Sequence, residues 1–420
     1  MKKLFQHQMS IIVLTLFLDS LGFGILIPIV PLLFADATSP FYMLSGAVSV
    51  QTGYILLGLL TAIFPLMQLF STAILGQLSD KYGRRPVLLY TLFVTSISYA
   101  LFAVGIALKN IPLLFISRAL AGISSGNMSV AQASIADLTK PEDRAKNFGL
   151  MGAAFGIGFI LGPFIGGKLS DPTVLPFLNP TIPFVFAALL SFANALSVKS
   201  FFNETNKFIK IEKVLAWGKA IQNIRKAFNL KHVRFLFLTN FLFMSGFTFF
   251  VTFFSVYLID KFHFNQGGIG DFFAFIGLWI VFTQGFLVRK VAKYFNEYQV
   301  LRFTIIADGF FIGLMYFAPH AWVLYFINPF IAICNGLSFA NMAGLISRSV
   351  DQKIQGEVLG INGSVQALAQ LIPPVLSGVL AAILAPEIPL LVAAGLIIFS
   401  GILFNVFYKP TKTPEHIPSY

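Results

Sequence analysis

The sequence predicts an all-α integral membrane protein with twelve transmembrane helices in two pseudo-symmetric halves of six. First, the chain has 420 residues and 57% of them are hydrophobic, which is more than the water-exposed surface of a soluble protein accommodates. Second, apolar runs recur close to the length of about 20 residues that spans a bilayer. Third, parts of the first half of the chain return in the second half, which indicates an internal repeat.

Twelve apolar runs lie between clusters of charged and turn-forming residues. The first six predicted helices cover residues 9–34, 52–77, 86–107, 112–136, 147–170 and 181–201. The second six cover residues 235–259, 267–290, 299–318, 321–345, 356–381 and 387–408. The first run begins like a signal peptide, but it is too long and no small-residue cleavage site precedes a soluble domain. We therefore expect an uncleaved first helix.

These helices divide the chain into four parts: an N-terminal half (1–201), a cytoplasmic linker (202–231), a C-terminal half (232–410) and a cytoplasmic tail (411–420). The linker contains "IEKVLAWGKAIQNIRKAF". Its apolar residues recur at near-helical spacing opposite lysines, as in an amphipathic helix that lies on the inner leaflet. A plain tether and a regulatory element both fit this pattern, and we favour the tether.

Lysine and arginine set the orientation of the helices. With both termini in the cytoplasm, 25 of the 29 Lys and Arg residues fall on the cytoplasmic side. A helix count wrong by one would scramble this alternation. We therefore expect a multi-pass protein of the inner (cytoplasmic) membrane, and we interpret the net charge of +12 as a topology signal rather than a sign of nucleic-acid binding.

The internal repeat is visible in short motifs. "GISSGNM", which begins at Gly122, returns as "GLSFANM" at Gly336, and Asp137 returns as Asp351 at the same offset. Each match is short, but the offsets are nearly constant. Transporter repeats of this kind usually enclose a site near the middle of the bilayer and rock about it.

Three ionisable residues fall well inside predicted helices: Asp19, Arg118 and Asp308. Each costs about 2.5–3.5 kcal/mol at the centre of a membrane helix, so such residues normally face a cavity or one another. An internal salt bridge that only fixes helix packing is one interpretation. The other is a carboxyl group in a cavity that binds a proton on one side of the membrane and releases it on the other, with Arg118 tuning one of the two acids.

The fifth predicted helix is rich in glycine. Gly158, Gly162 and Gly166 are four residues apart, as are Gly152 and Gly156, and small residues at this spacing allow two helices to pack closely. Pro163, next to Gly162, removes a backbone hydrogen-bond donor from the helix, and Gly167 completes the run. Tight packing here would also limit ion leak through a transporter.

Amide side chains at membrane depth are candidates for the lining of a cavity, although some only link helices. They are Gln68, Asn127, Gln132, Asn240, Gln284, Asn335, Asn341, Gln366 and Gln370. Cys334 is the only cysteine and the five histidines are scattered, so we expect neither a disulfide nor a metal site. Because no catalytic triad and no phosphate-binding glycine loop is present, we expect neither an enzyme nor a cofactor.

With these motifs the sequence resembles the major facilitator superfamily, and within it the drug/proton antiporter branch that includes the tetracycline efflux proteins. "GQLSDKYGRRPVLL" (76–89) is similar to the signature loop between helices two and three. "SRALAGISSG" (117–126) is similar to the helix-four motif with its arginine, and "GFILGPFIGG" (158–167) to the helix-five motif of antiporters. "LDSLGFGILIPIVPLL" (18–33) and "FTIIADGFF" (303–311) place acids where the tetracycline group has them.

Helix three departs from that group, because Ser98 stands where an acid precedes the tyrosine. This departure concerns the tetracycline substrate and not the fold.

The resemblance implies a cytoplasmic gate, formed by Gly76, Asp80, Gly83, Arg84, Arg85 and Asp137. A carboxylate there can bind an arginine and face the N-terminal dipole of a neighbouring helix. Such contacts would latch the cytoplasmic side of the two halves while the transport site faces outwards. A topology signal alone also explains the charges, but it does not require the two glycines.

The resemblance also implies the activity: proton-coupled export of a small amphipathic compound by alternating access, carried out by a monomer in the lipid bilayer. Asp19 and Asp308 would be the proton or substrate carboxylates. One alternative is proton-coupled or facilitated uptake of a metabolite or metal chelate. The glycine-rich helix five, which is similar to the antiporter motif, argues against this alternative. The other is a transport-inactive receptor or scaffold, for which a large soluble domain would be expected.

Overall fold

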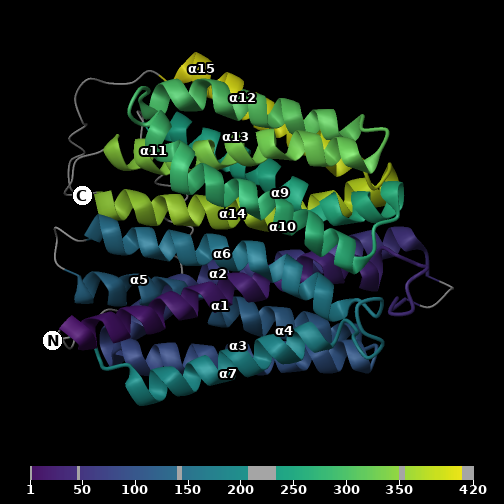
Figure 1. The fold of residues 1–420 in the computed structure, drawn as a ribbon. Coiled ribbons are helices and arrows are strands. Elements are labelled where there is room, and N and C mark those ends of the chain that lie inside the picture. The colour runs from purple at the N-terminus through teal and green to yellow at the C-terminus, as the bar shows by residue number, and fades with distance from the viewer. Residues whose placement is uncertain (1, 45–47, 140–143, 207–232, 350–354, 409–420) are drawn as a thin grey trace. The chain divides into compact units, whose positions relative to one another are not determined.

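The computed structural model describes residues 2–44, 48–139, 144–206, 233–349 and 355–408, and every regular element in these ranges is a helix (Figure 1). The first half of the chain contains α1 (Lys2–Phe34), α2 (Val50–Tyr82), α3 (Arg84–Ala107), α4 (Ile111–Ser124), α5 (Asn127–Leu138), α6 (Arg144–Ser170) and α7 (Ile182–Phe201). The second half contains α9 (Arg234–Phe262), α10 (Gln266–Phe282), the π-helical turn η2 (Thr283–Leu287), α11 (Val288–Val291), α12 (Glu297–Tyr316), α13 (Ala321–Arg348), α14 (Gln355–Ile383) and α15 (Ile388–Phe407). The amphipathic helix predicted for the linker falls mainly on 207–232, outside the described residues.

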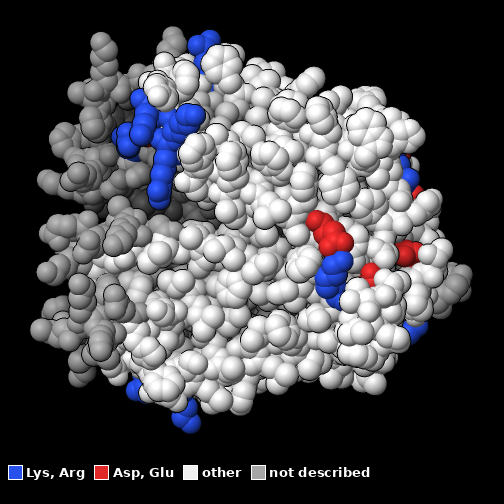
Figure 2. Space-filling view, viewed as in Figure 1, with Lys and Arg blue, Asp and Glu red and all other residues white. Residues whose placement is uncertain are grey.

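Within the described residues, eleven helical spans are long and apolar enough to cross a membrane. The remaining apolar run of the twelve predicted is divided between α4 and α5, which are too short to be counted singly. Most of the surface visible in Figure 2 carries neither basic nor acidic side chains, as expected for a surface that faces lipid. The chain is therefore a multi-pass membrane protein.

Contacts divide the described residues into two units. The first contains 2–53, 63–206 and 264–274, and the second contains 54–62, 233–263 and 275–408. In the first unit, α1 packs against α6 and α7, and α3 packs against α4 and α7. In the second unit, α9 packs against α14 and α15, and α12 packs against α13 and α15. The two repeats thus share one internal arrangement.

The prediction of one continuous helix over 112–136 is wrong. The run divides at Ser125 and Gly126, where the backbone amides of Met128 and Ser129 donate to carbonyl groups three residues back. Such a 3₁₀-type irregularity in a helix often marks a hinge. An added Cβ at Gly126 would lie within 3.0 Å of the Ser71 backbone, so the break lies where the chain packs closely against α2.

The charged segment between the second and third helices is shorter than predicted. Helix α2 continues to Tyr82 and α3 begins at Arg84, so Gly83 alone separates them and Asp80 lies in the last turns of α2. Gly83 has φ +102°, a conformation that side chains with a Cβ rarely adopt. This one residue turns the chain so that Asp80 and Arg84 lie on adjacent helix ends.

The eighth predicted helix, over 267–290, is also not uniform. Its C-terminal part contains the π-helical turn η2, which includes the cavity candidate Gln284. Because this run has no regular polar face, the shift of register that a π turn causes does not show in its sequence. Single π turns within α-helices are frequent at functional sites.

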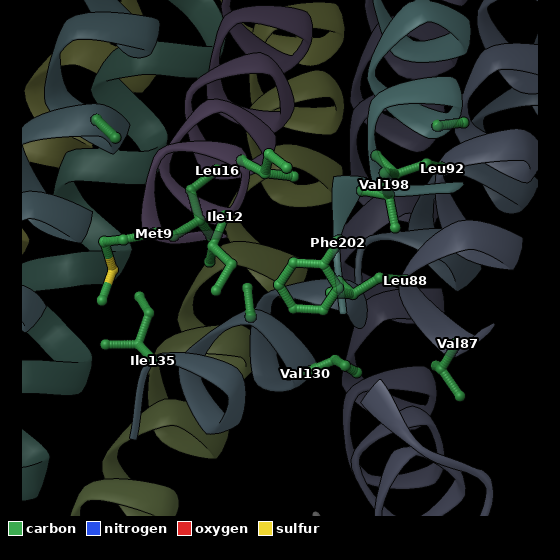
Figure 3. Close-up of a cluster of buried hydrophobic side chains, with 14 residues drawn as sticks. Met9, Ile12, Leu16, Val87, Leu88, Leu92, Val130, Ile135, Val198 and Phe202 are labelled. Carbon is green, nitrogen blue, oxygen red and sulfur yellow. The ribbon is translucent and has the colours of Figure 1, made fainter. Parts of the chain in front are cut away.

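Apolar side chains of α1, α3, α5 and α7 form the core at one end of the first unit (Figure 3). Met9, Ile12 and Leu16 of α1 and Leu88 of α3 belong to this cluster. Phe202, directly after α7, is also buried there with 1% of its surface exposed. Its burial fixes where the chain leaves α7, which matters for the polar network described below.

The glycines of α6 form a close seam with α1. A Cβ added at Gly158, Gly162 or Gly166 would lie less than 3.0 Å from a backbone carbonyl oxygen of α1, at residues 17, 21 and 25 respectively. Gly152 and Gly156 have the same spacing, yet no atom lies within 4 Å of an added Cβ at either. The prediction of close packing therefore applies to the first three glycines and is wrong for the other two.

We expect Gly162→Leu to destabilise the protein by about 1–3 kcal/mol or more, because the larger side chain overpacks a seam that is closed by backbone. Gly156→Leu on the same helix is the matched control and should change stability by less than about 0.5 kcal/mol. The apparent melting temperature of the purified variants and their yield after size-exclusion chromatography measure this. An equal loss in both variants would contradict the seam.

Two further helix crossings repeat this small-residue packing, one in each unit. In the first unit, Gly167 of α6 faces Gly270 at the start of α10, and an added Cβ at either glycine would lie 3.0–3.3 Å from the Cα of the other. In the second unit, Gly378 of α14 packs on the backbone of Tyr54 and Ile55 in α2. Gly58, one turn along α2, packs on the backbone of α14 at Pro374. The beginnings of α10 and α2 thus cluster with helices of the opposite sequence half.

Candidate functional site

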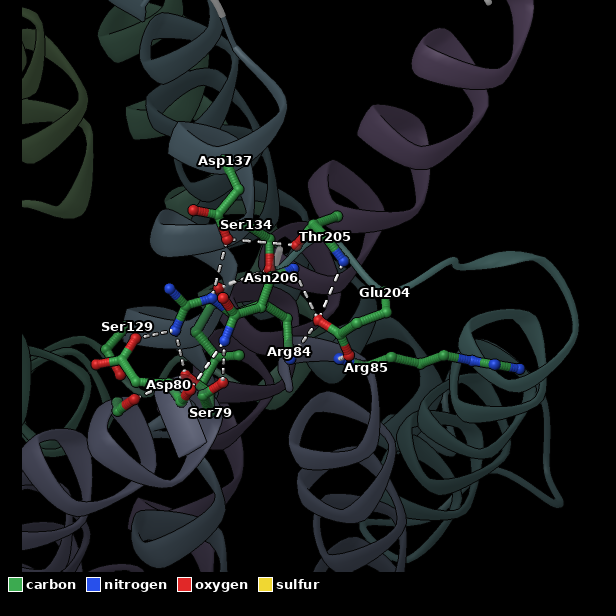
Figure 4. A network of polar contacts seen from close by, with 12 residues as sticks. Ser79, Asp80, Arg84, Arg85, Ser129, Ser134, Asp137, Glu204, Thr205 and Asn206 are labelled. Atoms are coloured by element: carbon green, nitrogen blue, oxygen red, sulfur yellow. Dashed lines mark hydrogen bonds and ion pairs between the residues drawn. The ribbon is translucent and has the colours of Figure 1, made fainter. Parts of the chain in front are cut away.

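Arg84 is the centre of a polar network at the junction of α2 and α3 (Figure 4). Its Nη1 donates to Asp80 Oδ1 at 2.6 Å and to Ser79 Oγ at 2.6 Å, and its Nε donates to Asp137 Oδ2 at 3.0 Å. Arg84 is 7% exposed, whereas the Asp80 side chain is 53% exposed. One buried guanidinium thus joins α2, α3 and the C-terminal end of α5 by charge-assisted hydrogen bonds.

Glu204 caps the N-terminus of α3 from a distant part of the chain. Its Oε1 accepts from the backbone amide of Arg84 at 2.8 Å, and its Oε2 accepts from that of Arg85 at 3.1 Å. A carboxylate at this position satisfies free amides and favours the positive end of the helix dipole. The sequence predicts a carboxylate of this segment at the N-terminus of a neighbouring helix. In the structure, Glu204 is the acid that occupies this position, at the start of α3.

The segment 203–206 closes over the end of α2 as well. The side-chain amide of Asn206 donates to the backbone carbonyl of Asp80 at 2.9 Å, and Thr205 Oγ1 lies 3.4 Å from Asp137 Oδ2. Buried Phe202 anchors the start of this segment. Arg85 takes little part, because among the described residues its guanidinium donates only to the backbone carbonyl of Lys199.

The remaining gate candidate, Gly76, lies where α2 approaches α5. An added Cβ there would lie 3.4 Å from Ser129 Oγ, and the Ser129 hydroxyl donates to the Thr72 carbonyl at 3.1 Å. The candidates Gly76, Asp80, Gly83, Arg84 and Asp137 therefore lie at one junction. The sequence analysis missed Glu204, although it is one of only two acids in the basic segment 203–230.

Asp19 lies in the middle of α1 beside polar groups of two other helices, α3 and α5. Its Oδ2 is buried and accepts no hydrogen bond, although the residue as a whole keeps some exposed surface. The Asn127 side chain interacts with this carboxyl group at a geometry short of a hydrogen bond. The Tyr99 hydroxyl lies against Gly22, one helical turn from Asp19 on the same face of α1.

Arg118 is 3% exposed and lies over the Phe64 ring, with 4.5 Å between its Cζ and the ring centroid. Its Nε has no hydrogen-bond partner, and no carboxylate of the described residues lies within ion-pair distance. Tyr99 interacts electrostatically with both Arg118 and Asp19. The three groups thus form one buried polar cluster in which the acid and the base are not paired directly.

Asp308 is fully buried in the second unit, where α12 packs against α13. Its Oδ2 accepts from the side-chain amide of Asn335 at 3.2 Å, and its Oδ1 has no partner. Within the described residues no Lys or Arg forms an ion pair with it. An internal salt bridge, the other interpretation of this acid, is therefore not formed by Asp308 with any described residue.

The amide candidates fall into two groups. Asn127, Asn240 and Asn335 are buried, and Asn240 donates to Asn362 Oδ1 at 2.7 Å. The glutamines retain exposed surface: Gln68, Gln132, Gln284, Gln366 and Gln370. Partly buried Asn341 donates to the Leu337 carbonyl of its own helix. Glutamines are therefore better placed than asparagines to meet a ligand.

The end of α6 makes polar contacts with the start of α10. Asp171 is 2% exposed, and its Oδ2 accepts from the backbone amide of Gly267 at 3.2 Å and from Asn265 Nδ2 at 3.0 Å. Lys168 Nζ lies 2.8 Å from Asp271 Oδ2. These bonds reinforce the glycine crossing of α6 and α10 and must break if those helices separate.

The buried carboxyl groups could bind protons, and the polar contacts between helices could break and re-form in a conformational change. Searched over the described residues, no cluster of three His, Cys, Asp or Glu side chains could hold a metal ion. Isolated carboxyl groups within a repeat of membrane-spanning helices are the architecture of a membrane transporter.

The model of the Major Facilitator Superfamily matches residues 12–368 and 290–419. The chain therefore belongs to the Major Facilitator Superfamily, a family of membrane transporters, and the predicted fold class is confirmed.

Similar proteins cover nearly the whole chain. A tetracycline resistance protein of class C from Escherichia coli is 30% identical over 370 residues, which cover 88% of each chain. The quinolone resistance protein NorA of Staphylococcus aureus is 27% identical over 379 residues, 89% of each chain. Among solved structures, the human organic anion transporter MFSD10 has a TM-score of 0.71 at 23% identity, covering 95% of this chain and 99% of that one. A D-xylose–proton symporter has a TM-score of 0.76 at 15% identity, covering 98% and 100%.

Proposed function

We propose that this transporter exports small amphipathic compounds in exchange for protons by alternating access. It would act as a monomer in the inner membrane, with both termini in the cytoplasm and without cofactor or nucleic acid. The observation that carries the proposal is Asp308, a fully buried carboxyl group with one unpartnered oxygen and no cation paired to it among the described residues.

A buried carboxyl group without a cation is much cheaper to keep neutral than ionised. Asp308 is therefore suited to hold a proton while its surroundings are dry and to release it when water reaches the site. Asp19, with its buried and unpartnered Oδ2, is suited to the same role in the first unit. Two such groups, one in each repeat, allow proton binding and substrate binding to exclude each other.

The polar junction and the helix crossings support alternating access. In the proposed orientation the Arg84 network lies on the cytoplasmic side, and the contacts of α10 with α6 and of α2 with α14 lie on the outer side. Each set joins elements through a few hydrogen bonds or glycine contacts. Breaking and re-forming such contacts would let helices shift within each unit as the transport site changes sides.

The names of the relatives favour an aromatic, amphipathic substrate. The similar proteins confer resistance to tetracycline and to quinolones, and both compound classes combine fused rings with ionisable groups. Partly exposed Gln68, Gln132 and Gln366 would supply hydrogen bonds to such compounds without demanding one geometry. Export is preferred to uptake on the strength of these relatives.

A growth-protection assay tests the direction of transport and the class of substrate. In an efflux-deficient bacterium, wild-type protein should raise the inhibitory concentration of at least one compound in a panel of tetracyclines, quinolones, lipophilic cations and metal chelates. Asp19→Asn should lose most of that protection, whereas Asp36→Asn, at the helix end outside the cluster, should keep it. Increased sensitivity with wild-type protein would instead indicate uptake.

A further inference from the structure

The second repeat carries an exposed basic cluster where the first repeat carries the Arg84 network. Arg289 and Lys290 lie in α11 and Lys293 directly follows it, and all three are exposed. Figure 2 shows Lys and Arg side chains gathered on the face that carries α11. Arg302, one turn into α12, is exposed as well.

These cations have no acidic partners among the described residues. In the first repeat, Arg84 contacts Asp80 and Asp137. In the second, the described residues near the cluster contain one ion pair, which joins Arg348 to Glu297 at 3.1 Å and leaves Arg289, Lys290 and Lys293 unpaired. Several neighbouring cations repel one another, so this arrangement favours an anion.

Aromatic side chains lead from the membrane-spanning part of α10 to the cluster. The rings of Phe275, Trp279, Phe282 and Phe286 follow one another with centroid separations of 6.5, 5.8 and 5.6 Å. Lys290 Nζ then lies 5.7 Å from the Phe286 centroid. Phe282 and Phe286 are 44% and 53% exposed, so the outer part of this row is open.

Further aromatic residues surround the cations. Tyr294, Phe295 and Phe303 are 73%, 55% and 71% exposed. Aromatic rings at the ends of membrane-spanning helices are typical of the boundary between acyl chains and headgroups. A row of rings that ends under unpaired cations therefore offers contact to an acyl chain and to a phosphate at once.

We propose that Arg289, Lys290 and Lys293, together with the aromatic row Phe282–Phe286, form a binding site for an anionic phospholipid of the inner leaflet. The site rests on the proposed orientation, in which α11 ends in the cytoplasm, where the leaflet is negatively charged. The headgroup phosphate binds the cations, and one acyl chain lies along the rings. In the first repeat, Arg84 is already paired with the carboxylates of Asp80 and Asp137. We therefore expect this lipid site in the second repeat alone.

Lipid binding to the purified full-length protein tests the site without any transport. Mixed micelles of phosphatidylglycerol or phosphatidylcholine are titrated while the apparent melting temperature is recorded, and co-purified lipid is quantified by mass spectrometry. Wild-type protein should be stabilised by phosphatidylglycerol and far less by phosphatidylcholine. The triple variant Arg289→Gln, Lys290→Gln, Lys293→Gln should bind phosphatidylglycerol about 100-fold more weakly, at roughly fivefold for each cation.

The matched control neutralises three exposed cations elsewhere, in Lys109→Gln, Lys199→Gln, Arg234→Gln, and should bind phosphatidylglycerol like the wild type. Equal weakening in the two triple variants would overturn the site, because net charge alone would then explain binding. Equal stabilisation of the wild type by inorganic phosphate would also overturn it, by assigning the site to free anions. Since no step requires transport, these outcomes are independent of the test for export.

Discussion

Replacing Asp308 with Asn is expected to abolish proton-coupled transport while leaving the protein folded and inserted. The amide oxygen of Asn can still accept from Asn335 Nδ2, the bond that Asp308 Oδ2 accepts at 3.2 Å, and its size is nearly unchanged. Only the exchangeable proton is lost. Substrate-driven proton movement should therefore fall to background, whereas exchange of labelled for unlabelled substrate, which requires no net proton transfer, should continue.

The matched control is Asp260→Asn, an exposed acid in the last turn of α9, which should keep both activities. Retained coupling in Asp308→Asn would remove Asp308 from the mechanism. Loss of exchange together with coupling would show that the side chain is needed for substrate binding or for the conformational change, and not for the proton alone.

Replacing Arg84 with Ala is expected to reduce turnover roughly 5- to 150-fold, with a much smaller effect on substrate affinity. The change leaves Asp80 and Asp137 without their shared cation. Removing one partner of a buried ion pair costs about 3–5 kcal/mol. Because the Asp80 side chain is 53% exposed, solvent screening lowers this cost to about 1–3 kcal/mol. A change of that size in the free-energy difference between two conformations slows the transport cycle and leaves the substrate-binding site unchanged.

Arg85→Ala provides the comparison, because it removes the same charge from the same end of α3. Its guanidinium contacts only a backbone carbonyl, and its own amide keeps the bond to Glu204. Turnover measured in vesicles with matched protein content should remain close to wild type. If the two variants behave alike, the segment acts through membrane topology and not as a gate.

The helices and most of the residues at the junction of α2 and α3 could be predicted from the sequence, because each signal is local. Apolar length predicts a membrane-spanning helix, and charges concentrated around Gly83 indicate a junction. The sequence places Asp137 with the arginines of this segment, and the structure identifies Arg84 as the arginine that it contacts.

Contacts between distant segments could not be predicted in this way. Glu204 caps α3 from a segment 120 residues further along the chain, and no local pattern links the two. The glycines of α6 show why spacing alone is insufficient: Gly152 and Gly156 repeat every four residues, as Gly158 and Gly162 do, but only the second pair faces α1. Likewise, Asn335 and Gln366 are both cavity candidates by sequence, but in the structure Asn335 is buried whereas Gln366 keeps exposed surface.

The most direct test of proton-coupled export is a proton flux measurement in inside-out membrane vesicles with an acidified lumen and a pH-sensitive dye. Tetracyclines, quinolones, lipophilic cations and metal chelates are added in turn to vesicles that contain wild-type protein or Asp308→Asn. The account predicts that at least one compound dissipates the gradient with wild-type protein and none does with the variant. No response to any compound in wild-type vesicles, with folded protein present, or an equal response in both, would contradict proton-coupled export through Asp308.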